Sequence, residues 1–157
     1  ADFYNPFSQF VVKATNPLVL PLRRIIPSLG RLDTATLLLA YAVMLTKLLL
    51  LQVIQYGQVA FTASVLWAVI ELIREGLTLL FYVVIIRALM SWFSQGRNPV
   101  EYVMHQLTEP VLRPIRSVLP SMGGLDLSAL VVIIGLQFLN YLYWGFYPAL
   151  NRIILSI

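Results

Sequence analysis

The sequence predicts an all-α polytopic membrane protein, and two observations lead to this prediction. The first is composition: of 157 residues, 59% are hydrophobic and 11% are charged, and the mean hydropathy is +0.82. So little polar surface cannot coat a soluble globule, whereas it suits a chain that crosses a bilayer. The second is an internal repeat, because residues 98–126 resemble residues 5–33 with every landmark displaced by 93 positions. The predicted fold is therefore two parallel repeats, each made of a helix, a Pro-rich interfacial loop and a second helix.

The repeat keeps its register without a gap. Of the 33 positions from Asn5 to Leu37, 12 are identical to their partners from Asn98 to Leu130. The matching landmarks are Asn5-Pro6 and Asn98-Pro99, Thr15 and Thr108, Pro17 and Pro110, Pro21 and Pro114, Arg23 and Arg116, Gly30 and Gly123, and Asp33 and Asp126. Proline-rich apolar loops rarely match over this length by chance, so both segments are interpreted as copies of one structural unit.

The first loop, residues 1–33, is too interrupted to span a bilayer and too apolar to float in water. Pro17, Pro21 and Pro27 are expected to break the backbone repeatedly, and Asn5 is expected to cap a short helix. We expect short amphipathic helices that lie along the membrane interface with basic side chains toward the lipid phosphates. These basic residues are Lys13, Arg23, Arg24 and Arg31.

The first membrane span is predicted over residues 34–56, which are 23 residues with one charge. Such a run is long enough to cross the hydrocarbon as a helix. Further on, Glu71 and Arg74 lie three positions apart on one helical face and can pair, so they are placed at the far interface. An interfacial helix is therefore expected over about residues 59–72, followed by a second span.

These segments divide the whole chain. Repeat 1 covers 1–56, with its interfacial loop at 1–33 and its span at 34–56; a link with the interfacial helix covers 57–75; repeat 2 covers 76–147, with spans at 76–93 and 127–147 around the loop at 94–126; and an interfacial tail covers 148–157. The first helix of repeat 1 is absent from this sequence. A run R-A-L-M-S-W-F precedes the second loop, and a shift of 93 positions places its counterpart upstream of Ala1, where we expect another apolar helix.

The distribution of positive charge predicts the orientation. The two loops hold seven of the eleven Lys and Arg residues, whereas residues 57–70 hold none. Loops rich in Lys and Arg remain in the cytoplasm, so both loops are expected to face it.

The order of landmarks, ending in P-S-x-G-G-x-D-L-S, and the R-A-L-x-S-W-F run before them resemble the YggT/YlmG family of small bacterial and plastid membrane proteins. The resemblance covers both repeats and hence nearly the whole chain. It implies a multi-pass protein, here expected in the bacterial inner membrane. Proteins of this kind have been linked to the assembly of membrane complexes, to the organisation of division or of the nucleoid, and to osmotic-stress ion handling.

The repeated charged and turn residues are the candidate structural or interaction site. Asp33 and Asp126 each open a following helix, where a carboxylate can accept backbone N–H bonds; capping is favoured over a paired-acid catalytic role. Arg23 and Arg116 can pair with these aspartates or bind lipid phosphate. The remaining members are Pro17, Pro110, Gly30, Gly123 and Gly124, the last two forming a turn before Asp126.

Lys47 and Arg87 lie within apolar spans, where an ionisable side chain is costly unless it is paired, snorkels or lines a wet path. Snorkelling to the headgroups is the favoured interpretation. The alternative is an ion path formed by Lys47, Arg87, Gln137 and Asn140.

Other site chemistries find little support. The chain has no cysteine, which excludes disulfides, thiolate metal sites and cysteine nucleophiles. His105 is a lone histidine on a short helix and is not expected to bind metal or haem, and Gly123-Gly124 lacks the context of a phosphate loop. The Lys and Arg residues form no basic face with interleaved aromatics, so no direct nucleic-acid binding is expected. No cofactor and no enzymatic activity are predicted.

The function expected from the sequence is that of a non-enzymatic scaffold, assembly or accessory subunit for another membrane complex. Its expected partners are membrane lipids and another membrane protein complex or a second copy of itself. The alternative is a small ion channel or an osmotic-stress ion transporter, which rests on Lys47 and Arg87.

Overall fold

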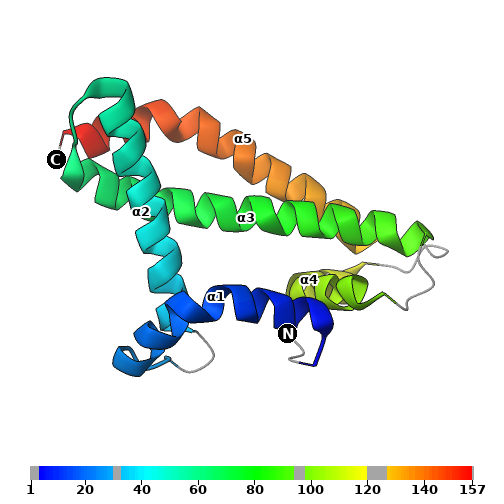
Figure 1. Cartoon of the computed structure of the whole chain (residues 1–157). Coiled ribbons are helices and arrows are strands. Elements are labelled where there is room, and N and C mark those ends of the chain that lie inside the picture. Colours follow the sequence, from blue (N-terminus) through cyan, green and yellow to red (C-terminus); the bar gives the residue numbers. More distant parts are fainter. Residues whose placement is uncertain (1–3, 30–32, 94–97, 120–126, 157) are drawn as a thin grey trace. The chain divides into compact units, whose positions relative to one another are not determined.

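The computed structural model describes residues 4–29, 33–93, 98–119 and 127–156 (Figure 1). Within these residues the chain forms five helices, which confirms the predicted all-α class. They are α1 (Pro6–Ile25), α2 (Thr34–Tyr56), α3 (Phe61–Phe93), α4 (Pro99–Val118) and α5 (Leu127–Leu155).

Two helices of the described part are long and apolar enough to cross a membrane. They are α2, with a mean hydropathy of 2.2 in its most apolar window, and α5, with 1.6. Only 6% of that window in α2 and 17% in α5 are buried inside the protein. A helix that is apolar on all sides and still exposed is suited to lipid rather than to water, so these helices favour membrane association. The segment predicted as a further span, residues 76–93, forms the C-terminal half of α3.

The stretches that form α1 and α4 are continuous helices, which corrects the expectation that Pro17 and Pro21 break the backbone; Pro27 lies beyond the end of α1. Pro17 and Pro21 lie inside α1, and Pro110 and Pro114 lie inside α4. A proline in a helix removes the hydrogen bond to the carbonyl four residues earlier and crowds that carbonyl. Because the two prolines of each helix are four residues apart, both defects fall on one side, and the other side keeps its hydrogen bonds.

Asparagine caps begin both of these helices in the same way. The side-chain oxygen of Asn5 accepts a hydrogen bond from the N–H of Phe7 at 2.9 Å, and that of Asn98 accepts one from the N–H of Val100, also at 2.9 Å. The next residue is proline in both copies, at the first helical position, where its missing N–H has no helical partner to lose. The predicted cap positions are therefore confirmed.

Helices α3 and α5 run through two positions where the sequence predicts a boundary. The predicted boundary between an interfacial helix and a span lies inside α3, where Gly76 is helical. One glycine costs a helix only about 1 kcal/mol relative to alanine, and the Glu71–Arg74 pair, with N–O distances of 2.7 and 2.9 Å, supports the preceding turn. Likewise α5 continues through Pro148, where the sequence predicts the start of an interfacial tail.

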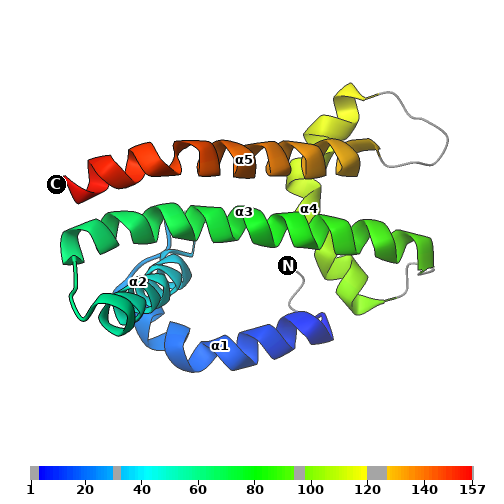
Figure 2. The same cartoon turned by 90° about the horizontal axis from the view of Figure 1, so that it is seen from above.

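The chain forms two compact units: unit 1 comprises Ala1–Val12 and Gly76–Trp144, and unit 2 comprises Lys13–Glu75 and Gly145–Ile157. In unit 1 the second half of α3 and the first half of α5 run side by side in opposite directions, and α4 crosses them (Figures 1 and 2). The core lies where the three helices meet. Its buried members are Val84 of α3, Leu112 of α4, and Ala129 and Val132 of α5.

In unit 2 the helices α2 and α3 are joined by a short turn and held by polar contacts. Gly57 ends α2 with a φ of 66°, a left-handed conformation that favours glycine. After the turn, the side-chain oxygen of Gln52 accepts hydrogen bonds from the N–H of Ala60 and the hydroxyl of Ser64, both at 3.1 Å. The hydroxyl of Tyr41 donates to the carbonyl of Val65 at 3.1 Å. These contacts fix the start of α3 against α2.

Candidate functional site

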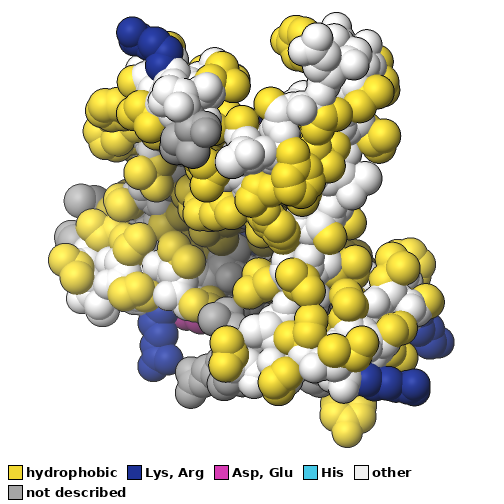
Figure 3. Space-filling view, turned by 90° about the vertical axis from the view of Figure 1, so that its left-hand side faces the viewer, with side chains coloured by type: hydrophobic (Ala, Val, Ile, Leu, Met, Phe, Trp, Pro, Cys, Tyr) yellow, Lys and Arg dark blue, Asp and Glu magenta, His cyan; other side chains and the backbone are white. Residues whose placement is uncertain are grey.

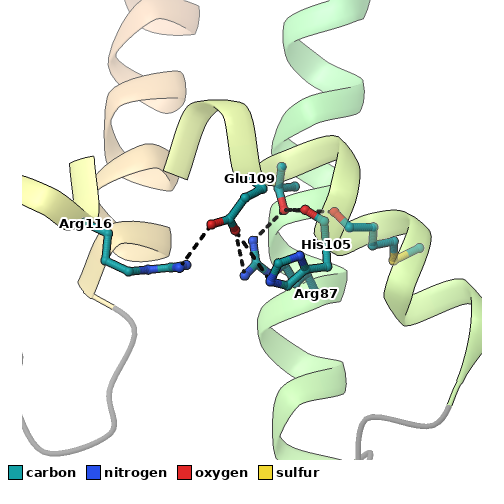
Figure 4. Close-up of polar contacts among 6 residues, drawn as sticks. Arg87, His105, Glu109 and Arg116 are labelled. Carbon is teal, nitrogen blue, oxygen red and sulfur yellow. Dashed lines mark hydrogen bonds and ion pairs between the residues drawn. The ribbon is translucent and has the colours of Figure 1, made fainter. Parts of the chain in front are cut away.

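A cluster of charged side chains lies where α3 crosses α4 in unit 1 (Figure 4). Its centre is the carboxylate of Glu109. The guanidinium of Arg87 approaches this carboxylate from α3, with Nη2 3.7 Å from Oε2. Arg87 is 13% exposed, so its charge sits in a largely dehydrated position within an otherwise apolar stretch of helix. An arginine in this environment is stabilised only if hydrogen-bond acceptors meet it, and α4 supplies them.

Thr108 is the second acceptor for Arg87. Nη1 of Arg87 donates to the Thr108 hydroxyl oxygen at 2.6 Å, and Thr108 is completely buried. That hydroxyl donates in turn to the carbonyl of Met104 at 2.8 Å, one helical turn earlier. The threonine hydroxyl thus donates a hydrogen bond within α4 and accepts one from Arg87 of α3. One arginine is thereby held by two successive residues of α4, Thr108 and Glu109.

Two further basic side chains reach Glu109 from its own helix. Nη1 of Arg116 lies 3.4 Å from Oε1, and Nε2 of His105 lies 3.5 Å from Oε2 (Figure 4). Oε2 is buried and lacks a hydrogen bond of normal geometry, so its stabilisation comes from the charges of its neighbours. One carboxylate therefore serves two guanidinium groups, which leaves the cluster with an excess of positive charge.

This arrangement suits a structural role better than catalysis or metal binding. Its arginines are cations at any physiological pH, and its carboxylate is already engaged by them. His105 has one carboxylate beside it, and in the part of the chain that the structure describes no group of three or more His, Asp or Glu side chains could hold a metal. The chemistry that the cluster provides is the fixing of α4 across α3.

In unit 2 the structure brings the predicted pair Arg23 and Asp33 together. Nε of Arg23 donates to Oδ2 of Asp33 at 3.0 Å, and Nη2 of Arg23 donates to the same oxygen. Asp33 is also the N-cap of α2: its Oδ1 accepts from the Thr36 N–H at 3.4 Å, and its Oδ2 accepts from the Thr36 hydroxyl at 2.7 Å. These hydrogen bonds, that of Arg23 above all, lower the pKa of Asp33 to about 2.

A further contact joins Pro27, just beyond α1, to the start of α2. The hydroxyl of Thr34 donates to the carbonyl of Pro27 at 2.7 Å. The end of α1 is thereby tied to the first turn of α2 by an ion pair and by a side-chain hydrogen bond. Gly30, the predicted turn residue, lies outside the described residues.

The second copy of this predicted clamp is only partly described. Asp126, Gly123 and Gly124 lie outside the described residues, and Arg116 contacts Glu109. The residue that matches Glu109 in the first repeat is Asn16, which is uncharged. The two repeats thus differ at the position where the second has its central carboxylate. Pro17 and Pro110, also predicted as structural residues, lie inside α1 and α4.

Lys47 and Arg87, for which snorkelling to the headgroups is the favoured prediction, each have a carboxylate partner. Lys47 of α2 lies 3.7 Å from Glu75 of α3, and Arg74 bridges Glu75 at 3.6 Å and Glu71 at 2.7 Å. Each intramembrane cation predicted from the sequence therefore faces a carboxylate on another helix. The other residues of the proposed ion path, Gln137 and Asn140, lie on α5, the first half-buried and the second exposed.

Glu109 is the functional residue that sequence reasoning missed. A signal was available, because an arginine in an apolar helix requires an acceptor, and the next helix of the chain offers Glu101 and Glu109. Deciding between these two glutamates depends on where α4 crosses α3, which local pattern does not reveal.

A family model described as CCB3/YggT matches residues 1–54 and 66–147 of this chain. The chain belongs to the CCB3/YggT family. Among its relatives are a Vibrio alginolyticus protein named for the proC 3′ region, 57% identical over 144 residues (90% of this chain, 78% of the relative), and the Escherichia coli K12 protein YggT, 49% identical over 140 residues (88% and 72%). A Pseudomonas aeruginosa relative is 42% identical over 145 residues (90% and 74%). No solved structure gives a significant match.

Family membership confirms the resemblance seen in the repeated landmarks. The names of these CCB3/YggT relatives describe them as uncharacterized and assign no activity. What the family adds is that the matched residues include α1, α4 and the clusters around Asp33 and Glu109.

Proposed function

We propose that this CCB3/YggT-family protein is a non-enzymatic scaffold, assembly or accessory subunit of another membrane complex in the bacterial inner membrane. In this proposal the chain crosses the membrane several times as two parallel repeats. The segments that contain α1 and α4 face the cytoplasm. Its partner is a membrane protein that packs against its lipid-exposed helices.

The way the charged side chains are used supports this proposal. Arg23 and Asp33 join α1 to α2, Lys47 and Glu75 join α2 to α3, and Arg87 and Glu109 join α3 to α4. Side chains that an enzyme would use for chemistry thus connect helices. What remains on the outside is apolar: α2 alone exposes eight large hydrophobic side chains. Such a surface is suited to contact with lipid or with another helix.

The helix boundaries support the internal repeat. α1 and α4 begin at Pro6 and Pro99, and both their first and last residues are 93 positions apart. The test is labelling of cysteines placed at Ser28 and Ser121 in this cysteine-free chain. A membrane-impermeant maleimide should reach both from the cytoplasmic side only. Labelling of one position from each side would mean that the repeats are inverted.

Site-specific photo-crosslinking tests the scaffold role itself. Val43, Leu50 and Ile54 share the outer face of α2 and are 61%, 58% and 78% exposed, whereas Leu48 on the opposite face is half-buried. With a photoreactive residue at each position in cells, we expect one protein to be captured from all three outer positions and not from Leu48. Capture of lipid alone at the outer positions would remove the basis for a protein partner.

A small ion channel or osmotic-stress ion transporter is the second candidate function. The observation in its favour is the network of Lys47, Glu75, Arg74 and Glu71 between α2 and α3, because ionisable groups inside membrane helices commonly mark ion pathways. The pairing of Lys47 and Arg87 with carboxylates gives these two residues a structural explanation, so the scaffold is preferred.

A further inference from the structure

The two repeats use the same amphipathic helix in two different ways. Helices α1 and α4 are each 20 residues long, carry their prolines at matching positions and begin with matching caps. Both helices turn by about 100° per residue and begin at matched residues. Positions matched by the shift of 93 therefore lie on corresponding faces of the two helices. Any difference in the burial of matched positions therefore reports on what covers each helix.

Several apolar positions of α4 are covered by protein where their counterparts in α1 are exposed. The difference does not hold at every position, because Val19 of α1 is buried like its counterpart Leu112. At the C-terminal ends of the two helices, Ile25 and Val118 are both exposed. Val103 of α4 is 4% exposed, but its counterpart Phe10 of α1 is 70% exposed. Val111 of α4 packs on the unit 1 core, but its counterpart Leu18 of α1 is 61% exposed. The exposed large side chains of α1 are Phe7, Phe10, Val11, Leu18, Leu20 and Ile25. Of these, Phe7, Phe10, Val11, Leu18 and Ile25 lie on one side of the helix and form an apolar stripe, which we call the α1 stripe. Leu20 lies on the side of Lys13 and Arg24.

The two helices also differ in net charge. α1 contains Lys13, Arg23 and Arg24 and no acidic residue. α4 balances Arg113 and Arg116 with two glutamates. In the view of Figure 3, hydrophobic side chains cover much of the surface and Lys and Arg project at its edges, whereas Asp and Glu are scarcely visible. The helix with the exposed apolar stripe is thus also the basic one.

We propose that the α1 stripe docks into the surface of an anionic lipid bilayer. The stripe enters the boundary between headgroups and acyl chains, and the exposed side chains of Lys13 and Arg24 bind headgroup phosphates. Arg23, which pairs with Asp33, anchors the end of the helix to α2. α4, its neutral counterpart, packs on protein, so only the first repeat makes this lipid contact.

Charge decides between a lipid surface and a second copy of the chain. Two α1 helices packed against each other would bring Lys13 and Arg24 of both copies together. α1 has no carboxylate to offset these charges, and Asp33 is already paired with Arg23. Phosphatidylglycerol and other anionic headgroups supply the missing negative charge along the whole helix. The proposal does not depend on the identity of any partner complex.

The absence of native cysteine permits a direct test in the whole protein. Spin labels are attached to single cysteines at Phe10, Leu18 and Ile25 on the α1 stripe, and at Gln9 and Lys13 on the polar side. The protein is reconstituted in vesicles of phosphatidylglycerol with phosphatidylcholine. Collision rates with oxygen, which concentrates in the acyl chains, and with a water-soluble nickel complex then give the depth of each label.

We expect the three stripe positions to favour oxygen at one common shallow depth and the polar positions to favour nickel. Labels at Val103 and Val111 of α4 are the matched controls, because both positions are packed on protein and should be shielded from both agents. Lys13→Gln combined with Arg24→Gln should make the stripe labels shallower in vesicles with phosphatidylglycerol, and should leave them unchanged in phosphatidylcholine alone.

Three results would overturn the proposal. A depth that increases steadily from Phe10 to Ile25 would show that α1 spans the bilayer. Shielding of the stripe from both agents would show that a second copy or another protein covers it. If the depth of the stripe labels depends neither on the charge of the lipid nor on Lys13 and Arg24, anionic headgroups have no role in the docking of α1. A circular dichroism spectrum identical to that of the parent is required of each variant.

Discussion

The side-chain amide of Asn5 donates a hydrogen bond of 2.7 Å to the backbone carbonyl of Pro99, 94 positions away. The same side chain caps α1 through its oxygen, and Asn98, its repeat partner, caps α4. Asn5 is almost fully buried. One side chain therefore both starts the first amphipathic helix and joins it to the start of the second.

Replacing Asn5 by serine separates these two roles. Serine caps a helix about as well as asparagine but lacks the amide that reaches Pro99. Asn5→Ser should lower the free energy of unfolding by about 0.5 to 1.5 kcal/mol, the usual loss for one hydrogen bond. Asn98→Ser, the matched control, should change it little, because the cap is retained. Unfolding in detergent measures both, and equal losses would mean that the bond to Pro99 contributes nothing.

The Arg23–Asp33 pair should show its strength in the titration of the aspartate. The pKa of Asp33 lies at about 2, below the ordinary value of 3.8, because Arg23 and Thr36 donate hydrogen bonds to the charged carboxylate. The contribution of the pair to stability is therefore fully present above pH 3.8 and is lost as the pH falls through about 2. In Arg23→Gln the pKa should rise toward 3.8, as measured by NMR of the carboxyl carbon.

Variants of Asp33 separate the ion pair from the helix cap. Asp33→Asn keeps an oxygen for the Thr36 N–H and loses the ion pair, whereas Asp33→Ala loses both, so Asp33→Ala should be the less stable in detergent. Combining Arg23→Ala with Asp33→Ala should be no worse than Asp33→Ala alone. If instead the two losses add, Arg23 acts independently of Asp33 and is better assigned to lipid phosphate.

Features that depend on residues close together in the sequence are predicted well, whereas contacts between helices are not. The apolar helix over residues 34–56 and the caps at Asn5 and Asn98 depend on neighbouring residues, and the structure agrees with them. The pairing of Arg23 with Asp33 was one of two options, and the recurrence of both residues in each repeat favoured it. The usual helix-breaking effect of proline does not predict α1 and α4, because their internal prolines are four residues apart and lie on one side of each helix.

The contacts of Lys47 and Arg87 could not be derived from local patterns. Both were recognised as costly in an apolar helix, but their carboxylate partners, Glu75 and Glu109, lie on the next helix along the chain. Which turn of one helix meets which turn of the next is decided by side-chain packing over the whole crossing. For the same reason, the sequence shows that α1 and α4 are alike but not that α4 is covered by protein at positions such as Val103, whose counterpart Phe10 is exposed.

The Arg87–Thr108 hydrogen bond should be one of the larger contributions to the stability of unit 1. Thr108→Val keeps the shape of the side chain and removes the acceptor, which leaves a largely buried guanidinium with one partner fewer. The expected loss is about 1 to 3 kcal/mol, the range for hydrogen bonds to charged groups. Thr15→Val is the matched control in the first repeat, where the side chain is exposed, and should change stability by less than about 0.5 kcal/mol.

A double-mutant cycle assigns this loss to the pair. Arg87→Leu should destabilise the protein although it removes a charge from an apolar helix, and adding Thr108→Val to it should cost little more. If Arg87→Leu proves neutral or stabilising, the guanidinium is not held by α4, and the snorkelling interpretation returns.

Lys47 distinguishes a structural charge network from an ion path. Its ammonium and the Glu75 carboxylate are both about half exposed and 3.7 Å apart, a geometry that usually contributes less than about 1 kcal/mol. The free energy of unfolding of Lys47→Leu should therefore be close to that of the parent, since Arg74 still faces Glu75.

As a scaffold, the parent should also conduct no ions when it is reconstituted in liposomes. The measurement is potassium and proton flux under an imposed gradient, with the folded state of each sample checked by circular dichroism. Flux in the parent that disappears in both Lys47→Leu and Arg87→Leu would identify the network as an ion path and replace the scaffold by the transporter.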